Sequence, residues 1–187
     1  MSFLTRIEAQ ATSRSSSLLR DAIIVLGASL IIGLFAKVAI PLPFTPVPLA
    51  TQAQVCLFLG ALLGSKRGAL AVLLFLIQGS LGLPVFATGL ANITWLFGAK
   101  GGYLLGYLFG TFLTGYLVER CKEKTSKTLF FHMALGNLVI FTLGYLHLSA
   151  FVGFVPALVL GVLPFLLGDA FKLLLAVRAL KALRVCR

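Results

Sequence analysis

Charged residues, and acidic residues above all, are scarce in this sequence. Only 11% of the 187 residues are charged, and five Asp and Glu stand against sixteen Lys and Arg, which gives a formal net charge of +11. A chain that is 59% hydrophobic, with a mean hydropathy of +1.05, cannot supply the polar exterior of a soluble globule. We therefore expect an integral membrane protein.

Cysteine and histidine are also rare, with three and two residues. No two of them have metal-ligand spacing, and the sequence contains neither the phosphate-binding pattern G-x-x-x-x-G-K-[ST] nor the metalloprotease pattern H-E-x-x-H. An intramembrane aspartyl protease would need a second aspartate, but Asp169 is the only one well inside an apolar run. These absences predict a protein without metal or cofactor that is not an enzyme.

Long apolar runs are abundant, and a spanning helix needs about 20 such residues. Their lack of strand-like alternation predicts an all-α integral membrane protein, a bundle of six transmembrane helices forming one domain over residues 1–187. The six runs cover residues 21–40, 51–64, 68–83, 101–118, 128–148 and 154–177.

Basic residues mark every second connection between these runs. Thirteen of the sixteen Lys and Arg lie in residues 1–20, in the turn Lys66–Arg67, in residues 119–127 and in residues 178–187. Because Lys and Arg in short loops mark the cytoplasmic side, both termini are predicted to be cytoplasmic. The positive charge is thus explained by membrane orientation, and no nucleic-acid partner is expected.

Small residues recur at four-residue spacing in three of the runs, which lets helix backbones approach closely. Packing within the bundle and docking of another membrane subunit both remain open. The ridges are Ser29 and Gly33; Gly60 and Gly64; and Gly102, Gly106 and Gly110.

Asp169 and Lys172 are the most informative pair in the apolar runs. An ionised side chain inside a spanning helix costs roughly 2.5–3.5 kcal/mol and by default marks a functional site. Their i,i+3 spacing places both on one side of the last helix, where they either form a structural salt bridge or hold a polar ligand. Pro164 is expected to loosen the helix one turn before them.

Two external segments carry further candidates. Residues 41–50 contain four prolines, which exclude a helix, and Phe44, so they predict a stiff gating loop over a site, with a passive linker as the alternative. Residues 83–95 are apolar but broken and are expected to fold back into the bundle with Asn92 and Trp95. Lys100 is the only cation in the external connections, and Tyr103 follows on the next helix.

Four motifs in this order resemble the BioY family, from about residue 23 to residue 172. They are the proline loop, Leu83-Pro84-Val85-Phe86-Ala87, Gly101-Gly102-Tyr103-Leu104 and Leu167-Gly168-Asp169-Ala170-Phe171-Lys172. The family usually has Gly-Pro-Thr before the glycine pair, where this chain has Gly98-Ala99-Lys100, and no external arginine is found here.

The resemblance implies the substrate-binding S component of an energy-coupling factor (ECF) transporter, with high-affinity capture and uptake of biotin across the bacterial cytoplasmic membrane. Its partners would be a transmembrane coupling subunit, docked on Ser29 and Gly33, and ATPase subunits. An S component for another vitamin is the alternative. The resemblance places Asn92, Asp169 and Lys172 at or near the biotin-contacting positions. The chemistry of biotin adds Lys172 or Lys100 as the partner of its carboxylate, and Phe44, Trp95 and Tyr103 as candidate apolar walls.

Overall fold

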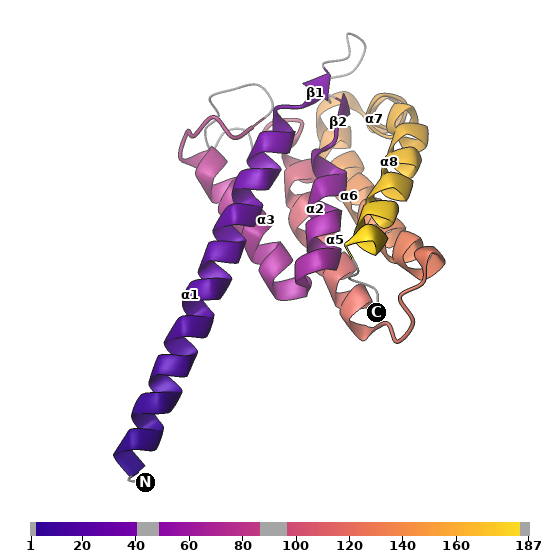
Figure 1. Cartoon of the computed structure of the whole chain (residues 1–187). Helices are drawn as coiled ribbons and strands as arrows, with labels where there is room; N and C mark the ends of the chain where they lie inside the picture. The colour runs from indigo at the N-terminus through magenta and orange to yellow at the C-terminus, as the bar shows by residue number, and fades with distance from the viewer. Residues whose placement is uncertain (1–2, 41–48, 87–96, 184–187) are drawn as a thin grey trace.

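The computed structural model describes residues 3–40, 49–86 and 97–183, with side chains described for 17–38, 51–86 and 97–183. Helices dominate these ranges (Figure 1). They are α1 (Phe3–Ala36), α2 (Gln52–Leu63), α3 (Ser65–Ser80), α5 (Gly101–Arg120), α6 (Ser126–Val152), α7 (Phe154–Gly161) and α8 (Leu163–Ala182).

The predicted all-α six-helix bundle is confirmed within the described ranges, because α1, α2, α3, α5, α6 and the α7–α8 pair fall on the six apolar runs. Three stretches there are long and apolar enough to cross a membrane on length and composition: 17–36, 126–152 and 154–182. Helices α2 and α3, with 12 and 16 residues, are shorter than the ~20 residues of a full span.

Some helices extend beyond the predicted apolar runs. Helix α1 begins at Phe3, so the polar N-terminal segment continues the first span as helix. Residues 149–152, predicted to be a connection, belong to α6, and Gly153 alone separates α6 from α7. Gly153 has a φ of 87°, the left-handed region that glycine adopts without a Cβ clash. Local hydropathy could not show that one glycine suffices for this turn.

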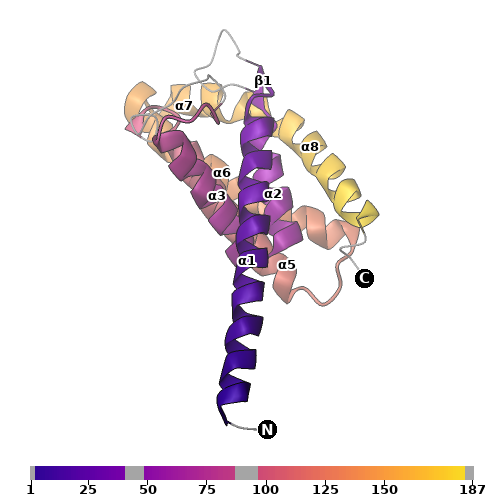
Figure 2. The ribbon, with the colours of Figure 1, turned by 60° about the vertical axis from the view of Figure 1, so that its left-hand side comes forward.

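The sixth run is a broken helix, as Pro164 suggested. Helix α7 ends at Gly161, Val162 has φ −124° and ψ −59°, and α8 begins with Pro164 in its first turn. Pro is tolerated there because the first helical N–H groups have no partner within the helix. The break turns the chain, so α7 lies across the end of the bundle and α8 runs back along it (Figure 2).

Helix α2 is the centre of the bundle and contacts α1, α3, α5, α6 and α8. Close approach to α5 depends on Gly60, where an added Cβ would lie 2.5 Å from the carbonyl oxygen of Thr111. At Gly110 on α5, an added Cβ would lie 2.6 Å from the Gly136 oxygen on α6. The predicted use of these glycines in helix packing is confirmed for Gly60 and Gly110.

The two ends of the bundle differ. At one end β1 (Ala39–Ile40) pairs antiparallel with β2 (Leu49–Ala50), which joins the two sides of the predicted proline loop. Residues 41–48 of that loop lie outside the described ranges. The α2–α3 turn and the α5–α6 connection lie at the other end, beyond which the N-terminal part of α1 projects (Figure 1). The β1–β2 connection therefore lies at one end of the bundle, and the two basic connections lie at the other, as the sequence predicted.

Candidate functional site

Asp169 lies on the buried face of α8. Buried residues recur every four positions along this face, at Phe165, Asp169, Leu173 and Val177. The Asp169 carboxylate therefore occupies a position that would otherwise hold an apolar core side chain. Asp169 is only 6% exposed. A buried carboxylate requires compensating partners, because removing a charge from water is costly.

Lys172 supplies the first of these partners. Its Nζ lies 3.3 Å from Asp169 Oδ1, and the two side chains are 19% and 9% exposed. The predicted i,i+3 pairing is therefore present in the structure. Since the lysine is the more exposed of the two, its ammonium group lies toward the edge of the bundle.

Asn137 of α6 supplies the second partner. Its Nδ2 donates to Asp169 Oδ2 across 3.5 Å, whereas its buried Oδ1 has no hydrogen-bond partner among the described residues. Sequence reasoning missed this residue. The available signal was an amide in the middle of a mostly apolar predicted span, residues 128–148, which is costly in a membrane unless the amide has a partner.

Gln54 of α2 approaches the same carboxyl group from a third helix. It is 3% exposed, and neither its Oε1 nor its Nε2 has a hydrogen bond within the described ranges. An unsatisfied buried polar group costs about 1–3 kcal/mol. Gln54 and Asn137 together therefore offer donors and acceptors that a polar ligand beside Asp169 can satisfy.

A cleft of about 260 Å³ adjoins this cluster between α2 and α8. Lys172 and Gln54 contribute its polar groups, while its walls are mainly apolar. Its lining consists of Thr51, Gln54, Val55, Phe58, Lys172, Leu175, Ala176 and Ala179. Mostly apolar walls with a few convergent polar groups are typical of small-molecule sites.

Tyr103 of α5 stabilises the helix break next to the cluster. Its hydroxyl donates to the carbonyl oxygen of Gly161 at 2.7 Å, in a buried setting. In a continuous helix that carbonyl would accept from Phe165, whose N–H instead donates to Val162 at 3.0 Å. Tyr103 thus satisfies a carbonyl that the break leaves over, which positions the start of α8 and hence Asp169. Its predicted role as a wall for the ligand stays a prediction.

Lys100 lies immediately before α5, at its N-cap, and is partly buried. Burial lowers the pKa of Lys100 below its usual value, because desolvation disfavours the charged form. The neighbouring Gly98 carbonyl contacts His147 Nε2 of α6 at 3.0 Å, which ties this connection to the bundle.

The remaining predicted ligand contacts, Phe44, Asn92 and Trp95, fall outside the described residues, and their assignments stay predictions. Ser29 and Gly33 are described, and both face the inside of the bundle. Ser29 is fully buried and its Oγ accepts from Gln78 Nε2 of α3 at 3.4 Å. An added Cβ at Gly33 would lie 3.3 Å from Val85. These contacts support the packing alternative for this ridge; docking there stays a prediction.

A bundle of apolar helices that brings an acid, a base and two amides together in its interior is typical of a membrane protein, and the buried polar cluster is its candidate small-molecule site. Many large apolar side chains, Leu138, Leu167 and Phe171 among them, are more than half exposed, as a lipid-facing exterior requires.

The chain belongs to the BioY family, whose model matches residues 8–186. The "Probable biotin transporter BioY" of Pyrococcus horikoshii is 39% identical over 132 residues, 71% of this chain and 77% of the relative. The "Biotin transporter BioY" of Rhizobium etli is 35% identical over 167 residues, covering 84% and 89% of the two chains. That of Thermotoga maritima is 37% identical over 147 residues, covering 78% and 85%.

A solved structure shares the fold. It is titled the S-component for biotin from an ECF-type ABC transporter, and it superimposes with a TM-score of 0.82 at 27% sequence identity, covering 90% of this chain and 93% of that one. The predicted family and the predicted S-component fold are both confirmed.

Proposed function

We propose that this chain binds biotin and serves its uptake as the substrate-binding S component of an ECF-type transporter in the bacterial cytoplasmic membrane. Family membership and the named biotin transporters among its relatives support the proposal. The observation that carries it is the cluster of Asp169, Lys172, Asn137 and Gln54, contributed by three helices and buried in an apolar bundle.

The chemistry of biotin suits this cluster. Biotin has a ureido group with two N–H donors and one acceptor, a carboxylate, and an apolar ring and chain. Asp169 accepts ureido N–H groups, while the Gln54 amide and the Asn137 Oδ1, which have no hydrogen-bond partner among the described residues, satisfy further polar edges. Lys172 or Lys100 neutralises the carboxylate, and we retain Asn92 as a polar contact.

Apolar walls complete the proposed site. Phe44, Trp95 and Tyr103 pack against the ring and chain of the vitamin, and residues 41–50 form the gating loop above it. The α7–α8 break separates the direction of α8 from that of α7, and Asp169 lies on the buried face of α8.

The remainder of the proposal concerns partners and orientation. ATP hydrolysis is supplied by separate ATPase subunits, because the sequence lacks a phosphate-binding loop, and a transmembrane coupling subunit links them to this chain. Both termini are cytoplasmic, since the basic turn Lys66–Arg67 and the basic 119–127 segment lie at the end of the bundle beyond which α1 projects.

The test is equilibrium binding of labelled biotin to the detergent-purified chain, with competition by unlabelled biotin, riboflavin or thiamine. Biotin alone is expected to compete. Lys172→Met should weaken binding at least tenfold, whereas Lys181→Met, an exposed cation on the same helix, should leave it unchanged. Absence of biotin binding together with binding of labelled riboflavin or thiamine would identify a different S component, and binding of no vitamin would refute the proposal.

A further inference from the structure

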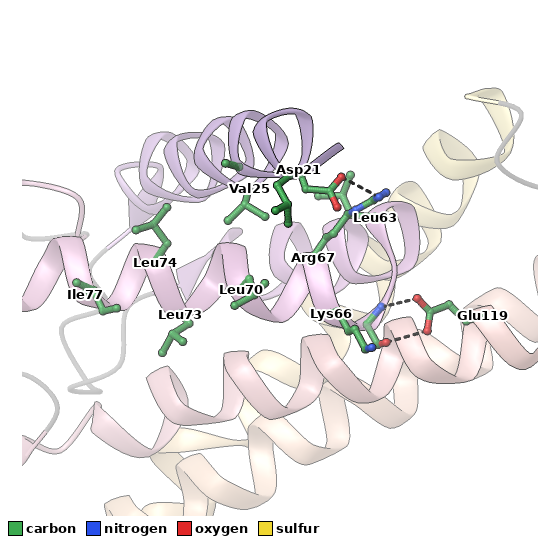
Figure 3. Close-up of a pocket in the computed structure, with 13 residues that line it drawn as sticks. Asp21, Val25, Leu63, Lys66, Arg67, Leu70, Leu73, Leu74, Ile77 and Glu119 are labelled. Atoms are coloured by element: carbon green, nitrogen blue, oxygen red, sulfur yellow. Dashed lines mark hydrogen bonds and ion pairs between the residues drawn. The ribbon is translucent and has the colours of Figure 1, made fainter. Parts of the chain in front are cut away.

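A second cavity lies along the groove between α1 and α3 (Figure 3). Its lining residues are distant in sequence from Asp169. It has a volume of about 900 Å³ and is open to the outside of the bundle. Its lining comprises Leu18, Asp21, Ala22, Val25, Leu63, Ser65, Lys66, Arg67, Leu70, Leu73, Leu74, Ile77 and Glu119. None of these residues belongs to the proposed biotin site.

The long wall of the groove is apolar. Leu70, Leu73, Leu74 and Ile77 occupy positions i, i+3, i+4 and i+7 along one side of α3, and Val25 faces them from α1 (Figure 3). From Lys66 to Ile77 the helix rises about 16 Å at 1.5 Å per residue. That length matches one leaflet of a hydrocarbon core about 30 Å thick.

The charged groups of the groove are confined to one end, at the α2–α3 turn. Asp21 of α1 pairs with Arg67 at 2.8 Å, which bridges the two helices there. Glu119 of α5 accepts from the backbone N and the Oγ of Ser65 at 2.9 and 2.7 Å. Both acids at this end are therefore engaged within the chain.

Lys66 is the second cation among the residues that line the groove, beside the paired Arg67. It is exposed, and it forms no ion pair with any acid in the parts of the chain that the structure describes. The groove thus combines an uncompensated positive charge at its mouth with an apolar wall one leaflet long. This arrangement is complementary to an amphiphile that has an anionic head group and an apolar tail.

An apolar groove that faces lipid is filled by hydrocarbon, because an empty gap forfeits the dispersion contacts of its walls. Water fits poorly, since most of the lining offers no hydrogen-bond partner. Basic pockets between membrane helices on one leaflet attract anionic head groups. A partner helix would also cover the apolar wall, but it would give no reason for the cation at one end.

We propose that the groove between α1 and α3 is a binding site for an anionic phospholipid, with one acyl chain along Leu70, Leu73 and Ile77 and the headgroup phosphate at Lys66. The lipid belongs to the leaflet nearest the α2–α3 turn. The site shares no lining residue with the proposed biotin-binding cluster.

The test is native mass spectrometry of the delipidated, detergent-purified chain titrated with phosphatidylglycerol or with phosphatidylcholine of the same acyl chains. One phosphatidylglycerol should bind in preference. Lys66→Ala should weaken that binding about fivefold, the loss expected for one cation at an anionic lipid surface. Lys181→Ala, which removes an exposed cation outside the groove, should not weaken it.

A second pair of variants tests the apolar wall. Leu73→Trp places an indole in the groove and should remove the bound lipid, whereas Leu138→Trp adds the same bulk at an exposed position on α6. Equal binding of both lipids, or equal loss in Lys66→Ala and Lys181→Ala, would overturn the proposal. Retention of the lipid in Leu73→Trp would do the same, and would favour a protein partner as the occupant.

Discussion

Replacing Asp169 by asparagine tests whether the buried ion pair serves a ligand or only the fold. The change keeps the shape of the side chain but removes its charge and one acceptor oxygen. In the unaltered protein, the Asp169 carboxylate accepts from Lys172 Nζ at 3.3 Å and from Asn137 Nδ2 at 3.5 Å. After the substitution, an amide N–H₂ would have to face one of these donors.

The expected loss can be estimated from one charge-assisted hydrogen bond to the vitamin. Such a bond contributes about 1.5–3 kcal/mol. At about 1.4 kcal/mol for each factor of ten, the Kd for biotin should rise about 10- to 150-fold in Asp169→Asn. The assay is equilibrium binding of labelled biotin to purified protein, with Glu123→Gln in the exposed α5–α6 connection as a control for lost negative charge.

Stability has to be separated from binding in this experiment. Breaking a buried ion pair by removing one member is destabilising, while replacing both members by apolar groups of similar size is often neutral. The double variant Asp169→Leu with Lys172→Met should therefore regain a Tm near that of the unaltered chain and still fail to bind biotin. If Asp169→Asn lowered the Tm but changed the Kd less than twofold, the pair would be structural and our reasoning refuted.

Three other predictions follow from the contacts of the bundle. Tyr103→Phe removes the hydrogen bond to the buried Gly161 carbonyl, which should destabilise the protein by about 1–3 kcal/mol and lower the Tm; an unchanged Tm would show that another group satisfies that carbonyl. Gly60→Leu places side-chain atoms against the Thr111 backbone, so size-exclusion chromatography should show aggregated protein, in contrast to an exposed Leu105→Ala control. If Lys100 holds the biotin carboxylate, affinity should be full while Lys100 is charged and should fall as the pH rises through its lowered pKa; Lys100→Met should bind more weakly and lose this pH dependence, and an unaltered pH profile would exclude the role.

Local features of the chain were sufficient for the class of protein and for part of the site. The apolar runs predicted the helices because hydrocarbon requires each backbone polar group to be satisfied within its own segment. The Asp169–Lys172 pair was also predictable from local sequence, because residues three apart on a helix are neighbours whatever surrounds the helix. Pro164 likewise indicated the weak point of the last span.

Packing between helices decided the rest. Gln54, Asn137 and Asp169 are far apart in the chain, and only the docking of α2 and α6 onto α8 brings their side chains to one carboxyl group. Whether Ser29 faced a partner or α3 depended on the rotation of α1 about its axis, which small-residue spacing does not determine. These properties belong to contacts between distant segments, so no local pattern of hydropathy or charge could establish them.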